Sequence, residues 1–129
     1  MGRTTRMAVA LGVAAAVAVP SVAMARGGDD IRRAGTCSAS TTSKIKLSDE
    51  NGRIEVEFEV DQNRNGVPWR VVITRNGTQV FSGVRTTRAP SGSFTARRVV
   101  ANGSGADVIR ARATSPSGQV CRASATWTQ

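Results

Sequence analysis

Two residue types on which catalytic chemistry often depends are missing from this sequence of 129 residues. It contains neither His nor Tyr, and its only cysteines are Cys37 and Cys121. The commonest general base, the commonest metal ligand and the usual histidine-activated nucleophiles are therefore lacking. We expect a protein that is not an enzyme and that needs no cofactor.

Paired carboxylates could still hydrolyse a substrate, and Glu55, Glu57 and Glu59 supply them at alternate positions. On one strand they would lie about 7 Å apart, within the range found in inverting glycosidases. Lys44 and Lys46 lie close by, however, and the sequence indicates no apolar pocket that would raise the pKa of one glutamate. We expect the glutamates to form a solvated face that the lysines partly neutralise.

Asp61, Asn63, Asn65 and Gly66 match the opening of a calcium-binding loop, with the glycine where a tight turn needs it. The twelfth position of such a loop should hold a bidentate glutamate, and Val72 occupies it. A single carboxylate also offers little charge to Ca²⁺. We therefore expect a polar strand connection without a metal, and Asp61, Asn63 and Asn65 are only a weak calcium-loop candidate.

The N-terminal residues predict export. Arg3 and Arg6 precede an apolar run that is rich in Ala and Val, and residues 23–25 read Ala-Met-Ala. This is the pattern of a cleaved signal peptide over residues 1–25, and the run is shorter than the roughly 20 residues of a membrane-spanning helix. Cleavage would change the formal net charge from +9 to about +7. We expect a secreted protein, extracellular or in the cell envelope, without a membrane span after cleavage.

The remaining chain is long enough for one domain. Residues 26–35 are rich in glycine and charge, which predicts a flexible leader before a domain over residues 36–129. Cys37 and Cys121 lie near the two ends of that domain, and in an exported chain an isolated pair predicts a disulfide. The bridge would close a long loop and contribute about 4.5 kcal/mol. A reactive thiol pair is the alternative, but it would be expected to show a C-x-x-C spacing.

Turn signals recur at short intervals and separate segments that resemble strands. Ile54, Val56, Phe58 and Val60 alternate with charged residues, as in a strand with one buried face. Seven or eight such segments predict an all-β, antiparallel sandwich or barrel. The expected strands are Thr36–Ser40, Lys44–Ser48, Arg53–Asp61, Trp69–Thr74, Gln79–Thr86, Ser93–Val100, Asp107–Thr114 and Val120–Thr128.

Hairpin registers can also be predicted. If Ser48 faces Arg53, apolar residues pair on one face of the hairpin and lysines meet glutamates on the other. The dipeptide Asn76-Gly77 predicts a two-residue turn that sets Ile73 against Val80.

The register set by the Asn76-Gly77 turn leaves Phe81 on the outside beside Val72. In the last hairpin, pairing Ala113 with Cys121 keeps the apolar residues inward. Arg97-Arg98 interrupts the alternation of its strand, which predicts a bulge there, with one of the two arginines beside the glutamate row.

The pattern resembles an immunoglobulin or fibronectin type III sandwich. The resemblance rests on Trp69 in the third long strand and on a final hairpin that reads Val-Ile-Arg-Ala-Arg-Ala-Thr-Ser-Pro-Ser-Gly-Gln-Val-Cys. The chain departs from that pattern because it has no tyrosine corner and because its cysteines fall on the first and last strands. It is also similar to small exported proteins of unknown function from high-GC bacteria, which implies a compartment but no activity.

In the sandwich that the chain resembles, three of the expected strands would share a sheet and point their arginines outward. The resulting predicted binding face consists of Arg70, Arg110, Arg112 and Arg122 beside Phe81. Such a face would attract an anionic cell-envelope polymer, sulfated or teichoic, or an acidic protein. Nucleic acid is a weaker candidate because no aromatic stacking platform accompanies the charge. A GC-rich genome would also favour arginine, so composition alone is an alternative explanation.

Two functions therefore follow from the sequence. The first is a non-enzymatic binding module that uses the arginine face. The alternative is an exported structural or protease-inhibitor-like protein that acts through an exposed loop, either Ala89–Gly92 or Ser115–Gly118.

Overall fold

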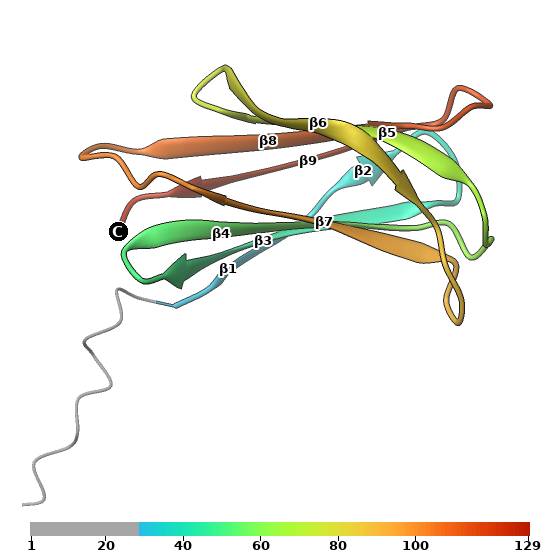
Figure 1. Ribbon diagram of the computed structural model, residues 1–129, viewed down its shortest axis with the longest axis horizontal. Helices are drawn as coiled ribbons and strands as arrows, with labels where there is room; N and C mark the ends of the chain where they lie inside the picture. Colours follow the sequence, from blue (N-terminus) through green and yellow to red (C-terminus); the bar gives the residue numbers. More distant parts are fainter. Residues whose placement is uncertain (1–28) are drawn as a thin grey trace, which may run out of the picture.

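A computed structural model describes residues 29–129, which form two antiparallel sheets with no helix (Figure 1). The expected all-β sandwich with one disulfide is therefore confirmed. The strands are β1 (Ile31–Ala34), β2 (Thr36–Cys37), β3 (Thr42–Glu50), β4 (Arg53–Asp61), β5 (Pro68–Arg75), β6 (Thr78–Thr86), β7 (Ser93–Val100), β8 (Asp107–Thr114) and β9 (Val120–Trp127).

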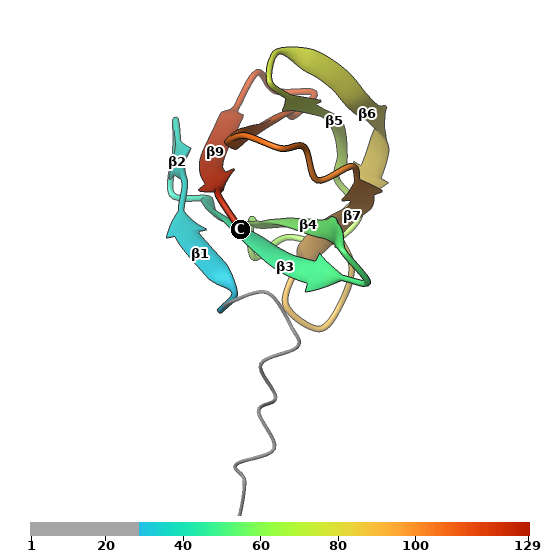
Figure 2. The same ribbon diagram turned by 90° about the vertical axis from the view of Figure 1, so that its left-hand side faces the viewer.

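The two sheets lie face to face, as the end-on view shows (Figure 2). The four-stranded sheet has the order β1-β3-β4-β7, and the five-stranded sheet has the order β2-β9-β8-β5-β6. Alternate residues of each long strand point into the space between the sheets, where aliphatic side chains and the tryptophans Trp69 and Trp127 are buried. The indole N–H of Trp69 donates a hydrogen bond to the Gln62 side-chain oxygen at 3.1 Å, so this large residue is buried without an unsatisfied donor.

The β3–β4 hairpin forms as expected, but the predicted register is wrong by two residues. Glu50 rather than Ser48 faces Arg53, so the turn contains only Asn51 and Gly52. Both residues have positive φ, 51° and 82°, which is the backbone of the tight turn that best matches the twist of a hairpin. A slip of two residues keeps every side chain on its own face, so the lysines still lie opposite glutamates.

The β5–β6 hairpin turns at Asn76-Gly77 as predicted, and its ladder then shifts. The register changes between Ile73 and Thr74, so Ile73 faces Phe81 instead of Val80. This bulge reverses which side of β6 faces the core from that point onward.

Of the two remaining predictions about strand pairing, one is confirmed and the other is wrong. Ala113 pairs with Cys121, as expected for the last hairpin. The bulge predicted at Arg97-Arg98 is not formed, because β7 keeps one unbroken register with β4 from Ser93 to Val100. Arg98 is exposed although its register position faces the core, since β7 is an edge strand.

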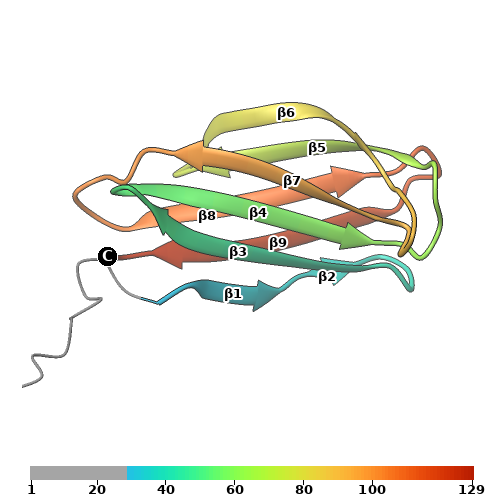
Figure 3. The ribbon, with the colours of Figure 1, turned by 60° about the horizontal axis from the view of Figure 1, so that its bottom comes forward.

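The described chain begins with two short strands that belong to different sheets. β1 pairs with β3, and after Gly35 the chain crosses to the other sheet, where β2 pairs with β9 (Figure 3). The expected flexible leader is therefore wrong for Ile31–Ala34, which form a strand. The predicted signal peptide over residues 1–25 lies outside the described residues. Between residues 29 and 129 no helix has the length and apolar character needed to cross a membrane.

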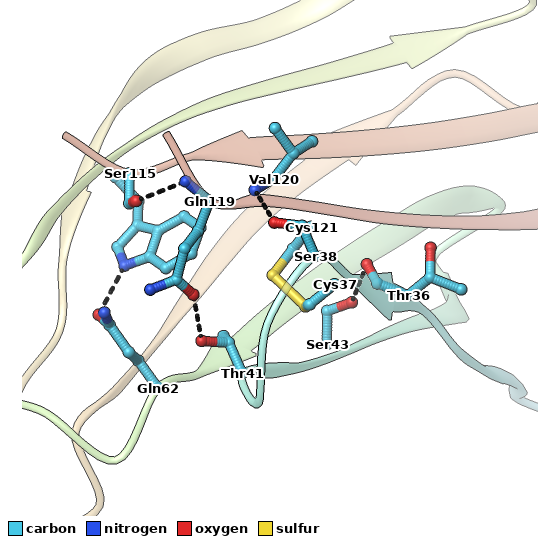
Figure 4. The surroundings of a disulfide bond; sticks show 11 residues. Thr36, Cys37, Ser38, Thr41, Ser43, Gln62, Ser115, Gln119, Val120 and Cys121 are labelled. Atoms are coloured by element: carbon cyan, nitrogen blue, oxygen red, sulfur yellow. Dashed lines mark hydrogen bonds between the residues drawn. A yellow bond between two sulfur atoms is a disulfide. The ribbon is translucent and has the colours of Figure 1, made fainter. Parts of the chain in front are cut away.

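The disulfide joins Cys37 of β2 to Cys121 of β9, as predicted, with the two Cα atoms 4.1 Å apart (Figure 4). Nearby side-chain hydrogen bonds link the same end of the sandwich. Thr41 donates to the Gln119 side-chain oxygen at 2.7 Å, and the Val120 N–H donates to the Ser38 hydroxyl at 3.0 Å. The disulfide therefore lies within a network that connects the first strands of the described chain to the last.

Candidate functional site: a basic groove on the five-stranded sheet

The outer face of the five-stranded sheet gathers the arginines that the sequence places on alternate positions. β5, β8 and β9 are neighbours, with Val72 opposite Arg112 and Arg112 opposite Arg122. Arg70 and Arg110 lie two residues away on the same faces of β5 and β8. All four arginines are exposed, so the predicted shared face is confirmed, while binding by it stays a prediction.

Two shallow hollows, of about 610 and 590 Å³, adjoin on this face because both are lined by Val72 and Arg112. The first hollow lies toward β9 and β2 and also contains Arg110 and Arg122. The second lies toward the β8–β9 turn and also contains Arg70. We call the two together the basic groove, which includes Arg33, Thr36, Pro68, Arg70, Val72, Thr74, Val84, Arg110, Arg112, Thr114, Pro116, Arg122 and Ser124.

No carboxylate lines the basic groove within the described residues. The ion pairs of residues 29–129 involve other basic side chains, and the four sheet arginines take part in none of them. Asp107 on β8 is turned inward, where it is buried and contacts Arg75. The groove therefore carries an uncompensated positive charge.

The prediction that Phe81 belongs to this face is wrong. The bulge in β6 sets Phe81 opposite Ile73, and its ring packs against the hydrophobic core. The Arg85 guanidinium carbon lies 4.7 Å from the centre of the Phe81 ring on that inner side. Val84 is the apolar side chain of β6 that reaches the outer face, and 52% of it is exposed beside Arg70.

Sequence reasoning missed Arg33 as a groove residue. Arg33 belongs to β1, a strand that the glycine-rich sequence before Thr36 did not predict. Gly35 lets the chain pass close to both sheets, since a Cβ atom at this position would clash with the Arg122 carbonyl of β9 and the Ser43 hydroxyl of β3. Only glycine fits this crossing, and a Gly between two short polar segments is the signal that could have indicated it.

The glutamate row of β4 lies on the opposite outer face and is neutralised from both sides. Lys44 lies 3.6 Å from Glu59, and Lys46 lies 3.6 Å from Glu57. On the β7 side, Arg97 donates a hydrogen bond to Glu55.

The Arg97 guanidinium, through its hydrogen bond and its charge, lowers the pKa of the Glu55 carboxyl, although burial acts in the opposite direction. A general acid needs a raised pKa, so the physical environment of Glu55 does not favour glycoside hydrolysis.

The Asp61–Gly66 segment forms the β4–β5 connection, and several of its polar groups have protein partners. The Asp61 carboxylate accepts a hydrogen bond from the Asn63 N–H at 3.0 Å. The buried Thr87 hydroxyl donates to the Arg64 carbonyl and accepts from the Val67 N–H.

Val72, the twelfth position of the supposed calcium loop, lies on the outer face of β5. Among residues 29–129 no three His, Cys, Asp or Glu side chains lie close enough to hold a metal ion. The hydrogen bonds of Asp61 and Thr87 give the turn a structural role, while its weak likeness to a calcium loop stays a prediction.

The two loops of the alternative function lie at the same end of the sandwich (Figure 3). In the Ala89–Gly92 loop, the Gly92 N–H donates to the Arg88 carbonyl, and residues 88–91 are exposed. In the Ser115–Gly118 loop, Ser115 is buried and its hydroxyl accepts from the Gln119 N–H at 3.0 Å. Each loop thus exposes three residues and buries one, Gly92 or Ser115, so the two loops are similarly accessible.

The predicted likeness to immunoglobulin and fibronectin type III sandwiches concerns the order of the strands as well as the two layers. The layers and the disulfide are confirmed, while the finer likeness stays a prediction. No protein-family model, curated protein or solved structure matches this chain, so its function has to be inferred from the residues of the site.

Proposed function

We propose that this protein is a non-enzymatic binding module that holds an anionic partner, a cell-envelope polymer or an acidic protein, in the basic groove. The observation that carries the proposal is that four exposed arginines share one sheet face with no carboxylate among them. Arginine binds carboxylate, sulfate and phosphate oxygens with two parallel hydrogen bonds, which favours this role.

The contact between Arg112 and Arg122 supports the proposal energetically. These residues lie directly opposite each other on β8 and β9, where like charges destabilise a sheet. Their guanidinium groups have no acidic partner in the described chain, so an anion between them would relieve the repulsion. A bound anionic group would thus stabilise the fold as well as the complex.

An extracellular or cell-envelope location also forms part of the proposal. A disulfide that joins residues 84 apart is compatible with an oxidising compartment. Secretion by cleavage after Ala25 is proposed on the sequence pattern of residues 1–25.

The strand order supports an immunoglobulin-like assignment. Among the seven long strands, β3, β4 and β7 lie in one sheet, and β6, β5, β8 and β9 lie in the other. In the immunoglobulin scheme these correspond to A-B-E and C′-C-F-G. We propose that β1 and β2 are additions to that arrangement, one at the edge of each sheet.

Retention on immobilised heparin tests the proposed binding. The triple variant Arg110→Glu, Arg112→Glu, Arg122→Glu should elute at a much lower salt concentration than the unmodified chain, because it replaces attraction by repulsion within the groove. The triple variant Arg53→Glu, Arg64→Glu, Arg88→Glu has the same net charge and changes only exposed residues outside the groove. Equal retention of the two variants would show that net charge, and not the groove, governs binding.

The accessible Ala89–Gly92 loop supports one alternative, an exported structural or inhibitory protein. Backbone hydrogen bonds between Arg88 and both Gly92 and Ser93 fix the base of the loop while its tip is exposed. Incubation with secreted proteases separates the two functions. An uncleaved, tight complex would favour inhibition, and simple cleavage at the loop would argue against it.

A further inference from the structure

We infer that the partner of the basic groove is a linear phosphate polymer whose repeating units carry no aromatic ring, such as a polyol phosphate chain. This inference rests on the proposed function and specifies it. Three features of the groove lead to it: the spacing of the arginines, the lack of available backbone groups, and the nature of the apolar side chains between the charges.

The arginines are spaced for several anions in series. Arg110 and Arg112 are alternate residues of β8, so their Cα atoms lie about 7 Å apart. Arg112 lies directly opposite Arg122, about 5 Å away across the strands. Arg70 extends the series into the second hollow, which shares Arg112 with the first. A single small anion would satisfy one or two of these guanidinium groups, whereas a chain of anions engages them all.

At the centre of the sheet face, β5 and β8 offer side chains but no free backbone hydrogen-bonding groups. β5 is paired with β6 on one side and β8 on the other, and β8 is paired with β5 and β9. An acidic peptide lying across this face would leave its own N–H and C=O groups without protein partners. A phosphodiester chain has no such groups, and its oxygens match the guanidinium donors.

The apolar side chains between the charges suit short carbon spacers. Val72 lies at the junction of the two hollows, and Val84, Pro68 and Pro116 line the second. The aromatic residues of the described chain point into the core or pack against it, so none is available on this face to stack with a base. The groove can therefore contact aliphatic spacers but cannot stack with nucleobases.

Titration calorimetry with poly(glycerol phosphate) and with poly-L-glutamate of matched charge tests the inference. At the same salt concentration the phosphate polymer should bind about tenfold more tightly or better. Arg112→Gln should weaken that binding about tenfold and lower the slope of log K against log salt by about one, because one phosphate contact is lost. The control Arg53→Gln removes the same charge from an exposed position on the other sheet and should leave binding unchanged.

The apolar contacts are tested separately. Val84→Ser should weaken binding of poly(glycerol phosphate) roughly threefold, because Val84 loses apolar contact with the spacer. It should not affect binding of inorganic polyphosphate, which has no carbon spacer. Val84 is half exposed, so this substitution should not disturb the core.

The outcomes distinguish this inference from the function on which it rests. Tighter binding of poly-L-glutamate would overturn the phosphate polymer and leave the anion-binding function standing. Competition by orthophosphate at the same total phosphate concentration would also overturn it, because the groove would then hold single anions. If neither polymer binds and heparin does not retain the protein, both the inference and the proposed function are wrong.

Discussion

Glu55 is the buried member of the glutamate row, with 8% of its surface exposed. A buried carboxylate is tolerated when a charged partner and hydrogen bonds replace water. Arg97 of β7 provides both, which links β4 and β7, the third and fourth strands of the four-stranded sheet, through their side chains. Glu57 and Glu59 are only partly buried and pair with lysines at longer distances, so they depend less on their partners.

This difference predicts how stability responds to acid. Arg97 lowers the pKa of Glu55 in the folded protein, so its contribution is present above the ordinary glutamate pKa and is lost as the pH falls through the lower folded value. Glu55→Gln should therefore reduce the melting temperature at pH 7, and the difference from the unmodified protein should shrink below about pH 4. Thermal unfolding followed by circular dichroism between pH 2 and pH 8 measures this.

The control is Glu59→Gln, which removes a more exposed carboxylate from the same strand. It should change the melting temperature little at any pH. A difference between unmodified protein and Glu55→Gln that stays constant down to pH 2 would contradict the assigned role of the Glu55 charge.

At the level of the strands, three of the four edge strands carry an arginine at a position that faces the core. These are Arg33 on β1, Arg85 on β6 and Arg98 on β7, opposite Ile45, Trp69 and Val56. A charge at such a position would be buried if another strand were added to the edge, so it discourages edge-to-edge association. β2, the fourth edge, has only two residues, which offers little to pair with.

Arg98→Val should therefore promote self-association. Valine favours strands and removes the charge that would have to be buried when two β7 edges meet. Light scattering after size-exclusion chromatography over a range of concentrations should show dimers or larger species for Arg98→Val. Arg98→Lys, which keeps the charge, should remain monomeric under the same conditions. A monomeric Arg98→Val protein would show that other features protect this edge.

The strands also show which parts of the fold the sequence could predict. The alternation of apolar and polar residues identified the seven long strands, because a buried face imposes a period of two on a strand. It could not fix the β3–β4 register, since a slip of two residues leaves every side chain on the same face. The positive φ values of Asn51 and Gly52 decide the register, and they depend on the turn rather than on the pattern.

The candidate site was predictable where the ladder is regular. Arg110, Arg112 and Arg122 follow from one hairpin with an unbroken register. Phe81 was misplaced because one bulge reverses the faces of β6, and no residue there marks it. Arg33 was missed because β1 is held mainly by pairing with β3 and shows no apolar alternation of its own.

For the whole molecule, the disulfide is the largest single constraint on the unfolded chain. It joins residues 84 apart, so the chain-entropy estimate of its contribution is about 4.5 kcal/mol. Replacing Cys37 and Cys121 by serine should lower the free energy of unfolding by about that amount and the melting temperature by roughly 20 °C. Chemical denaturation with and without a reductant measures the effect.

The serine variant itself provides the control, because a reductant should destabilise the unmodified protein and leave the variant unchanged. If reduction has no effect on the unmodified protein, the constraint must act on an unfolded state that is already compact.

The position of this disulfide also determines how the molecule would respond to a mechanical load. Cys37 and Cys121 lie close to the two ends of the described chain, and the covalent link between them bypasses the six long strands β3 to β8. A tensile force applied at residue 29 and residue 129 would pass through the sulfur atoms and would not reach the polypeptide between them. Only residues 29–36 and 122–129 could detach and straighten, to a span of at most about 3.4 Å per residue. A protein built this way would act as a nearly inextensible link between whatever is attached to its ends.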